Sequence, residues 1–250
     1  MSEQLRDGTA GLLAGLGSPT GRRGFLKWGG AAAAVVVAGG ACGDFGSKDS
    51  ATVMLPTTGP GAAVTIDFSS DIGILNYAFA LEQLEAAFYS AVVGSSSFAT
   101  TFTAQERLIL TDIRDHEVAH RDFFKAAIPA GSRIPDLTPN LGAVNLADKA
   151  AVLNTARTFE DLGVQAYNGA GPLFSNTASG QGFLTVAGKI VSVEARHAAA
   201  IRDLLAPKTK GANSFAPFDF DDFGAPGNIL GLAQPFIVET LRAINVPTIS

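Results

Sequence analysis

Two motifs with the same spacing, Glu-x-x-His, stand in separate segments of this 250-residue chain, each with the apolar periodicity of a helix. They pair Glu117 with His120 and Glu194 with His197. Residues three apart on a helix lie on one face, so each motif presents a carboxylate and an imidazole in the same direction. With so few glutamates and histidines in the chain, chance predicts about 0.1 such pairs. Carboxylate oxygen and imidazole nitrogen are metal ligands, so each motif is a candidate half of a metal site.

Two further carboxylates precede the motifs. Glu82 and Glu160 are each followed seven residues later by a tyrosine, Tyr89 and Tyr167. Two helical turns return a side chain to nearly the same direction, so each Glu and its Tyr line one face. Each Glu, Tyr and Glu-x-x-His residue of the second set follows its counterpart in the first set by 77 or 78 positions. The sequence therefore contains a diverged duplication of a helix pair, a Glu helix followed by a Glu-x-x-His helix.

Four helices that contribute Glu, Glu-x-x-His, Glu and Glu-x-x-His resemble the ligand set of ferritin-like di-iron or di-manganese carboxylate bundles. The segment Leu75 to Glu82, with Tyr89 after it, is similar to the first bundle helix of bacterioferritins and rubrerythrins. The resemblance covers residues 69–206 and implies an all-α, ferritin-like four-helix bundle with a long crossover between helices 2 and 3. It implies that two metal ions are held by six residues: Glu82, Glu117, His120, Glu160, Glu194 and His197.

The resemblance also implies a role for each group. The two motif glutamates would bridge or chelate both ions, each motif histidine would cap one ion, and Glu82 and Glu160 would be terminal carboxylates. Tyr89 and Tyr167 would each hydrogen-bond a ligand carboxylate across the bundle and so assist catalysis; the alternative is an ordinary aromatic core. The ions would be iron, with manganese as the alternative, because the bundle has no cysteine and offers only oxygen and nitrogen ligands.

The apolar neighbours of these glutamates also favour bound cations. A buried carboxylate without a partner costs several kcal/mol, and cations between four carboxylates remove that cost. The alternative is a bundle core in which the same six residues share protons and hydrogen bonds.

The chain departs from the family beside the ligands. Relatives often carry Asp immediately before the Glu of the second motif, where it orients a ligand histidine; this chain has Val193 there and His116 at the matching place in the first copy. His116 is predicted to lie beside the ligand face rather than on it. Glu85 has Gly163 as its counterpart in the second copy, and is predicted to be a flank charge or a support for the ligands. Such supporting residues commonly change metal affinity or activity about 10- to 100-fold, so this departure bears on metal identity and oxidative activity more than on metal binding.

The N-terminus resembles an export signal. Arg22 and Arg23 precede a weakly apolar stretch, residues 29–41, which is too short and glycine-rich for a membrane span. This pattern is similar to twin-arginine signals and predicts export to the periplasm or cell envelope. Cys42, the only cysteine, follows three small residues and resembles a lipoprotein acylation box. A lipid anchor on Cys42 and simple cleavage after Ala41 are the alternatives.

The predicted layout is a signal peptide (1–41), a flexible tether (42–68), the bundle (69–206) and a C-terminal strap with a short helix (207–250). Residues 128–145, with three prolines, can span a bundle of about 35 Å and would let helices 2 and 3 run parallel. The phenylalanines of 215–223 are predicted to fill grooves on the bundle, with a metal-entry or docking patch as the alternative. Residues 228–243 are predicted to be a fifth helix interrupted or restarted at Pro235.

The helix limits carry their own signals. Thr103 and Glu106 form a capping box that opens helix 2, Ser69 or Ser70 can cap helix 1, and Asn145 can cap helix 3.

The charge balance argues against a nucleic-acid partner, and the motifs and the resemblance leave three functions to consider. The net charge is −5, with 18 basic and 23 acidic residues, so no nucleic-acid partner is expected. The prediction is an exported protein of the desiccation-related ferritin-like type, an oxidoreductase of ferroxidase or peroxidase kind acting on Fe(II), O2 or peroxide. The alternative is a stress- or desiccation-related structural or binding protein whose metals are structural or absent. An iron store is a weaker third, because a tether and a long tail hinder closure of a cage; whether the chain forms a homodimer is left open.

Overall fold

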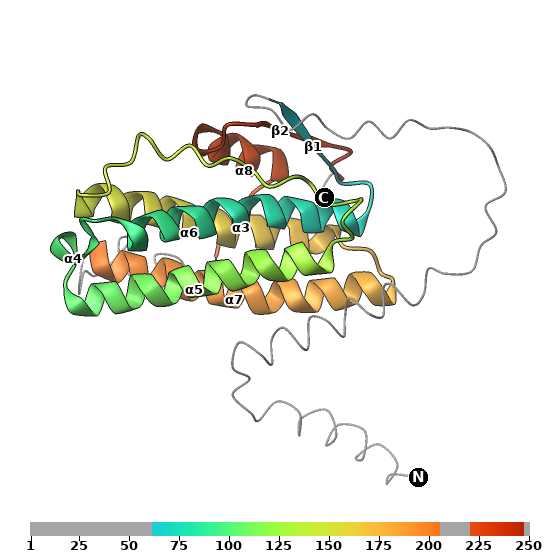
Figure 1. Cartoon of the computed structure of the whole chain (residues 1–250). Helices are drawn as coiled ribbons and strands as arrows, with labels where there is room; N and C mark the ends of the chain where they lie inside the picture. The colour runs from blue at the N-terminus through green and yellow to red at the C-terminus, as the bar shows by residue number, and fades with distance from the viewer. Residues whose placement is uncertain (1–61, 206–220, 248–250) are drawn as a thin grey trace, which may run out of the picture.

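Four long helices packed side by side make up most of the structure, a computed structural model that describes residues 62–205 and 221–247 (Figure 1). They are α3 (Asp71–Gly94), α5 (Ala104–Ala127), α6 (Lys149–Ala170) and α7 (Ala178–Leu205). The predicted all-α bundle is confirmed. The predicted export signal, Cys42 and residues 43–61 of the tether lie outside the described residues.

The helices pack as two pairs. α3 lies mainly against α5, with the single turn α4 (Phe98–Thr101) between them, and α6 lies mainly against α7. This pairing matches the duplication of a helix pair in the sequence. Within the described ranges, no helix is long and apolar enough to cross a membrane.

A long connection joins the two pairs. From the end of α5 it runs back along the bundle to the start of α6, so α5 and α6 are parallel, as predicted (Figure 1). Two amide side chains of α3 hold this connection. Asn76 donates to the carbonyl of Ser132 over 2.7 Å and accepts from the amide of Ile134 over 2.8 Å. Gln83 accepts from the amide of Leu137 over 2.7 Å, so buried backbone groups of the loop are satisfied by helix side chains.

Side-chain caps decide where the helices begin. The predicted capping box of Thr103 and Glu106 is present at the start of α5. α6 begins later than predicted, because Asp148 rather than Asn145 accepts hydrogen bonds from two amides of the first turn. At its other end α6 passes into the 3-10 turn η1 (Gly171–Leu173), since Pro172 has no amide hydrogen with which to continue the helix.

α3 is buried on almost every side, because α5, α6 and the strand β1 (Ala63–Asp67) all cover it. Its polar residues Asn76, Glu82, Gln83 and Glu85 are buried with the apolar ones. Two of them hold the long connection, so the two glutamates are the polar groups of α3 that the fold leaves for chemistry.

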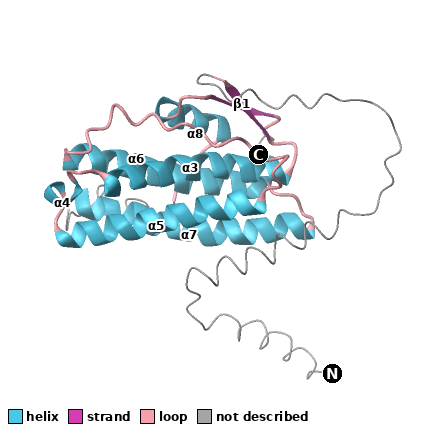
Figure 2. Cartoon of the chain, in the orientation of Figure 1, coloured by secondary structure: helices cyan, strands magenta, loops and turns pink. Residues whose placement is uncertain are grey.

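A small parallel sheet corrects two predictions (Figure 2). β1 pairs with β2 (Thr240–Ile244) in the register Ala63 opposite Thr240. The predicted tether of residues 42–68 is thus wrong over 63–67, where Val64 and Ile66 alternate inward as in a half-buried strand. The predicted helix of residues 228–243 is wrong over 240–243, which belong to β2.

The C-terminal segment agrees with the prediction in one place and differs from it in another. The helix α8 covers Pro226–Ala233 and passes into the 3-10 turn η2 (Gln234–Phe236), so the helix is interrupted around Pro235, which is one of the two predicted alternatives. Phe223 is 65% exposed and fills no groove. The segment docks through its backbone instead: the amide of Gly224 donates to the carbonyl of Gln165, and Asn168 donates to the carbonyl of Asp222, each over 3.0 Å. Residues 215–220 of the predicted strap lie outside the described residues.

Candidate metal centre

All six residues predicted as ligands converge inside the bundle. α3 contributes Glu82 and α6 contributes Glu160, while α5 and α7 each contribute one Glu-x-x-His motif. The four glutamates are 0% exposed and both histidines are buried. Their ligand atoms form two overlapping groups, and within each group all atoms lie within 4.8 Å of one another. The groups are Glu82, Glu117, His120 and Glu194, and Glu117, Glu160, Glu194 and His197.

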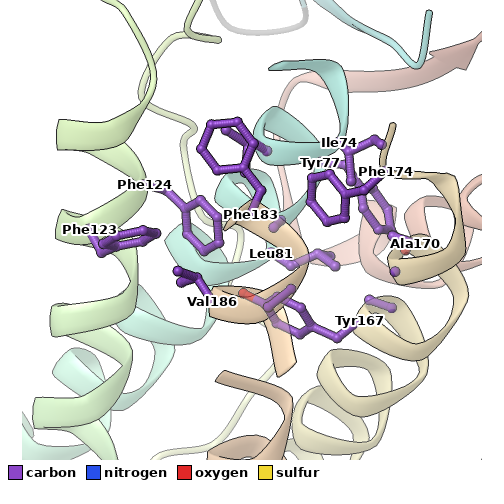
Figure 3. A pocket seen from close by; sticks show the side chains of 15 residues that line it. Ile74, Tyr77, Leu81, Phe123, Phe124, Tyr167, Ala170, Phe174, Phe183 and Val186 are labelled. Atoms are coloured by element: carbon purple, nitrogen blue, oxygen red, sulfur yellow. The ribbon is translucent and has the colours of Figure 1, made fainter. Parts of the chain in front are cut away.

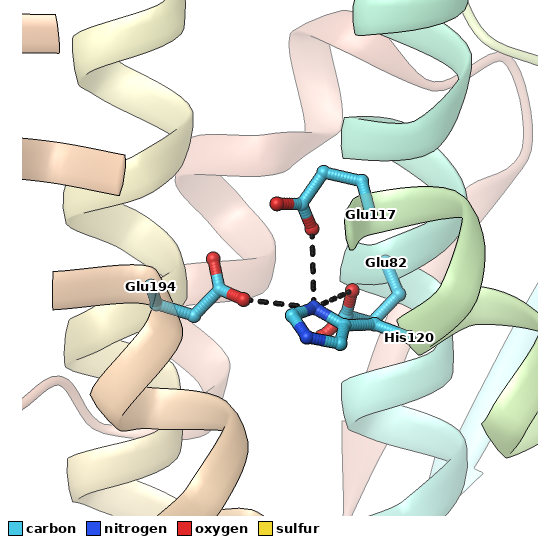
Figure 4. A group of neighbouring side chains, drawn as sticks. All are labelled: Glu82, Glu117, His120 and Glu194. Carbon is cyan, nitrogen blue, oxygen red and sulfur yellow. Dashed lines mark ion pairs between the residues drawn. The ribbon is translucent and has the colours of Figure 1, made fainter. Parts of the chain in front are cut away.

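The first group surrounds one ring nitrogen of His120. Figure 4 shows carboxylates from three helices directed at its Nδ1 atom. The oxygen of Glu194 lies 3.0 Å from this nitrogen, and those of Glu82 and Glu117 each lie 3.4 Å from it. The set is compact enough for one cation to replace these direct contacts.

The second group repeats this arrangement around Nδ1 of His197. The distances are 2.7 Å to Glu117, 3.4 Å to Glu160 and 3.7 Å to Glu194. Glu117 and Glu194 turn one oxygen toward each histidine, so they are the two carboxylates shared by both groups. The arrangement can chemically support two neighbouring cations with two bridging carboxylates.

Unsatisfied polar atoms show that the residues fit such ions. Eight buried nitrogen and oxygen atoms of this cluster lack a partner with hydrogen-bond geometry among the described residues: both oxygens of Glu117 and Glu194, Oε2 of Glu82 and Glu160, and Nδ1 of His120 and His197. Buried polar groups are nearly always satisfied in proteins, and buried carboxylates are costly unless they are paired or coordinate metal. The contacts between carboxylate and imidazole are close, but their directions suit a shared cation better than a hydrogen bond.

Each terminal carboxylate is held by a tyrosine from the opposite helix pair. The Tyr89 hydroxyl on α3 donates to Oε1 of Glu160 on α6, and the Tyr167 hydroxyl on α6 donates to Oε1 of Glu82 on α3. Burial raises the pKa of both hydroxyls, so they stay protonated as donors. In each glutamate one oxygen is therefore fixed by tyrosine while Oε2 faces the histidine.

The cluster stores protons when it holds no cation. Burial raises the pKa of Glu82 and of Glu160 to about 8, although the neighbouring imidazoles oppose the shift. Burial would lower the pKa of His120 and of His197, but the surrounding carboxylates outweigh it and raise both above the usual value. Burial would likewise raise the pKa of Glu117, yet the two imidazoles hold it below its usual range. Binding of cations must therefore displace protons.

Two neighbouring residues carry information that the sequence left open. His116, predicted to lie beside the ligand face, places its Nδ1 2.9 Å from Nε2 of His197. Glu85 is buried rather than a flank charge, and burial, aided by the surrounding carboxylates, raises its pKa well above the usual value. A Cβ atom at Gly163 would lie 3.1 Å from Oε1 of Glu85, so this glycine makes room for the carboxylate. In the sequence, the one indication that Glu85 is buried is the glycine at the equivalent position of the second copy, Gly163.

An apolar cavity lies beside Tyr167, the residue whose hydroxyl bonds to Glu82 (Figure 3). It measures about 20 Å³ as the space that the centre of a water molecule can reach, and Leu81, Phe124, Tyr167 and Val186 are among its walls. A cavity needs about 10–15 Å³ by this measure to hold one water molecule, so this one has room for a very small molecule. Tyr77 also lines it, with a buried hydroxyl that has no partner within the described residues.

Comparison with known proteins agrees with this architecture. The family described as "Ferritin-like domain" matches residues 70–207, a segment that contains the four long helices and all six clustered residues. No relative was found among curated proteins.

Proposed function

The chain belongs to the ferritin-like domain family, and on this premise we propose that its buried cluster holds two iron ions and oxidises Fe(II) with O2 as the electron acceptor. Peroxide is the alternative acceptor, and manganese the alternative metal. Nδ1 of His120 and Nδ1 of His197 would each hold one ion, Glu117 and Glu194 would be shared between the ions, and Glu82 and Glu160 would complete the two ligand sets. Bound iron would supply the one-electron redox chemistry of this reaction.

The observation that carries the proposal is the set of eight buried, unpartnered ligand atoms from four helices. Two divalent cations would satisfy all eight at once and would neutralise the carboxylates. Only nitrogen and oxygen are offered, which suits iron and manganese and does not suit an iron–sulfur cluster.

The chain's own residues also prepare the centre for a redox reaction. The tyrosine hydroxyls fix the orientation of the terminal carboxylates, and the apolar helix faces around the cluster exclude water.

The apolar cavity supports O2 over peroxide. O2 enters an apolar space without losing hydrogen bonds to water, whereas peroxide would lose such bonds. Among the described residues that line the cavity, only the Tyr77 hydroxyl is a buried polar atom without a partner, so little could replace them. Tyr167 lines the cavity, and its hydroxyl bonds to Glu82.

We further propose that the protein acts outside the cytoplasm. The twin arginines Arg22 and Arg23 and the small residues before Cys42 support export and either a lipid anchor or simple cleavage. Twin-arginine export carries folded proteins, which would allow the metals to be inserted before transport.

A second function, a metal-free structural or binding protein, is supported by one observation. Nδ1 of His197 lies 2.7 Å from Glu117, and a protonated imidazole there could neutralise part of the buried charge without metal. In that case the six residues would form a proton-sharing core.

One experiment separates the two functions. Metal-free protein is loaded with Fe(II) without oxygen, O2 is then added, and Fe(III) formation and O2 consumption are followed. The wild type should outpace buffer, Glu194→Ala should lose the reaction and retain less than one ion, and Glu85→Gln should keep both ions as the matched buried-carboxylate control. A wild type that binds two ions but reacts no faster than buffer would reject the oxidase and leave a structural metal site. A wild type that binds none would leave the metal-free core.

A further inference from the structure

The contact between His116 and His197 has the geometry of an in-plane hydrogen bond. Nδ1 of His116 lies 2.9 Å from Nε2 of His197, and the two ring planes differ by only 12°. The centroids of the two rings are 5.2 Å apart, which is close to the sum of the distance between the two nitrogens and the distance from each nitrogen to the centre of its own ring. The rings therefore lie edge to edge rather than face to face, and the N–H of one points at the lone pair of the other.

With a cation bound at Nδ1, this contact indicates which nitrogen of His197 carries its proton. Nδ1 of His197 faces the carboxylates of the centre, so it must be free of hydrogen to bind a cation. The proton then resides on Nε2, which donates to Nδ1 of His116. A metal-ligating histidine is commonly oriented by such an acceptor on its second nitrogen.

The other ligand histidine lacks this support. Nδ1 of His120 faces the carboxylates in the same way, but no side chain within 62–205 or 221–247 forms a hydrogen bond with its Nε2. In the duplicated sequence the residue equivalent to His116 is Val193, which immediately precedes Glu194. A valine side chain has neither donor nor acceptor, so the duplication has become unequal at this position.

We propose that His116 is a positioning residue that orients His197 and makes the two metal positions unequal, with the ion beside His197 bound more tightly than the ion beside His120. The inference rests on the proposed di-metal centre. His116 itself would not contact a metal ion, because its ring lies against Nε2 of His197, whereas Nδ1 of His197 faces the centre.

Titration with Co(II) tests the inference without relying on enzyme activity. Metal-free, full-length protein is titrated by calorimetry and by visible absorption, in which Co(II) reports its ligands. The wild type should take up two ions in two unequal steps. His116→Ala should weaken the tighter step about 10- to 100-fold, change its absorption band and leave the weaker step unchanged.

Two variants separate positioning from a general effect on the fold. His116→Asn places an amide oxygen where Nδ1 of the imidazole stands, and should restore most of the lost affinity. Val193→Ala changes the equivalent residue of the second copy, and should leave both steps within about threefold of the wild type because no ring nitrogen depends on it. The metal-free melting temperatures of His116→Ala and His116→Asn should agree, so that a difference in metal uptake cannot come from stability.

The possible outcomes distinguish this inference from the proposed function. Unchanged affinities in His116→Ala, equal weakening of both steps, or an Asn variant as weak as the Ala variant would each overturn the positioning role while leaving the di-metal centre intact. A wild type that takes up no Co(II) would overturn the metal centre and, with it, this inference.

Discussion

The hydroxyl of Tyr89 on α3 donates a hydrogen bond to the carboxylate of Glu160 on α6, across the interface between the two duplicated helix pairs. Tyr167 and Glu82 form the reciprocal bond. Each helix pair thus orients a terminal carboxylate of the other, and the centre is completed only when the pairs dock. The candidate metal site is therefore assembled only in the folded bundle.

Removing one of these hydroxyls should destabilise the protein and weaken metal binding. Tyr89→Phe leaves a buried oxygen of Glu160 without its donor, which should cost about 1–3 kcal/mol in the free energy of unfolding of the metal-free protein. Tyr77→Phe is the matched control, because the buried Tyr77 hydroxyl has no partner in the part of the chain that the structure describes, and its loss should be neutral or stabilising. Urea denaturation of both variants measures the difference. Equal effects of the two changes would contradict the assigned role of the tyrosine bond.

The metal-free protein should lose stability as pH rises through neutrality. Glu82 and Glu160 have a pKa of about 8 when folded and near 4.5 when unfolded, so the folded state holds protons that the unfolded state has released. Their stabilising contribution is complete below about pH 4.5 and is lost as pH rises to about 8. The raised pKa values of His120 and His197 act in the same direction. The pKa of Glu117 is lowered, so its stabilising contribution is present at neutral pH and is lost only as the pH falls into the acid range.

Melting temperatures of metal-free protein across this pH range measure the effect. The double variant Glu82→Gln/Glu160→Gln should flatten the decline. Metal should reverse it, because cations replace the protons and bind more tightly as pH rises. A metal-free melting temperature that climbs steadily from acid to alkaline pH would argue against the proton-storing cluster.

Docking of the segment before α8 depends on a glycine in α6. A Cβ atom at Gly169 would lie 2.0 Å from the backbone oxygen of Gly224, so Gly169→Ala should displace this segment and cost about 1–3 kcal/mol. Gly188→Ala on the exposed face of α7 meets no atom within 4 Å and should instead stabilise by about 0.5–1 kcal/mol through helix propensity. Thermal unfolding of the two variants distinguishes these signs, and a stabilised Gly169→Ala would refute the close backbone contact.

Filling the apolar cavity should slow O2 more than peroxide. Val186 is buried in its wall, and Val186→Phe adds volume without adding charge. The ratio of O2-dependent to peroxide-dependent Fe(II) oxidation should fall, while iron content stays at the wild-type value. Val191→Phe on the same helix is the control, since Val191 is not among the cavity walls. An unchanged ratio would remove the cavity from the path of O2.

The sequence predicted the centre well because its signal is local. The spacing within each Glu-x-x-His motif and the seven-residue step from Glu82 to Tyr89 follow directly from helix geometry, and the duplication relates one half of the centre to the other. The resemblance to ferritin-like bundles predicted parallel α5 and α6, and the proline-rich connection is long enough to span the bundle as this arrangement requires.

What the sequence could not predict depends on contacts between distant segments. Ala63 pairs with Thr240, and neither five-residue strand indicates its partner, so the sequence predicts a tether over 63–67 and a helix over 240–243. The burial of Glu85 follows from the space left by Gly163 on a facing helix, since a glutamate in a helix is more often solvated. The bond from His116 to His197 depends on how α5 is rotated against α7. The export signal and the acylation box at Cys42 stay predictions.

Anomalous diffraction from crystals loaded with Fe(II) tests the central claim most directly. The account predicts two iron peaks between Glu117 and Glu194, one beside Nδ1 of His120 and one beside Nδ1 of His197, and the loss of at least one peak in Glu117→Ala. Loaded crystals with no peak between the four helices, or with both peaks intact in Glu117→Ala, would contradict it.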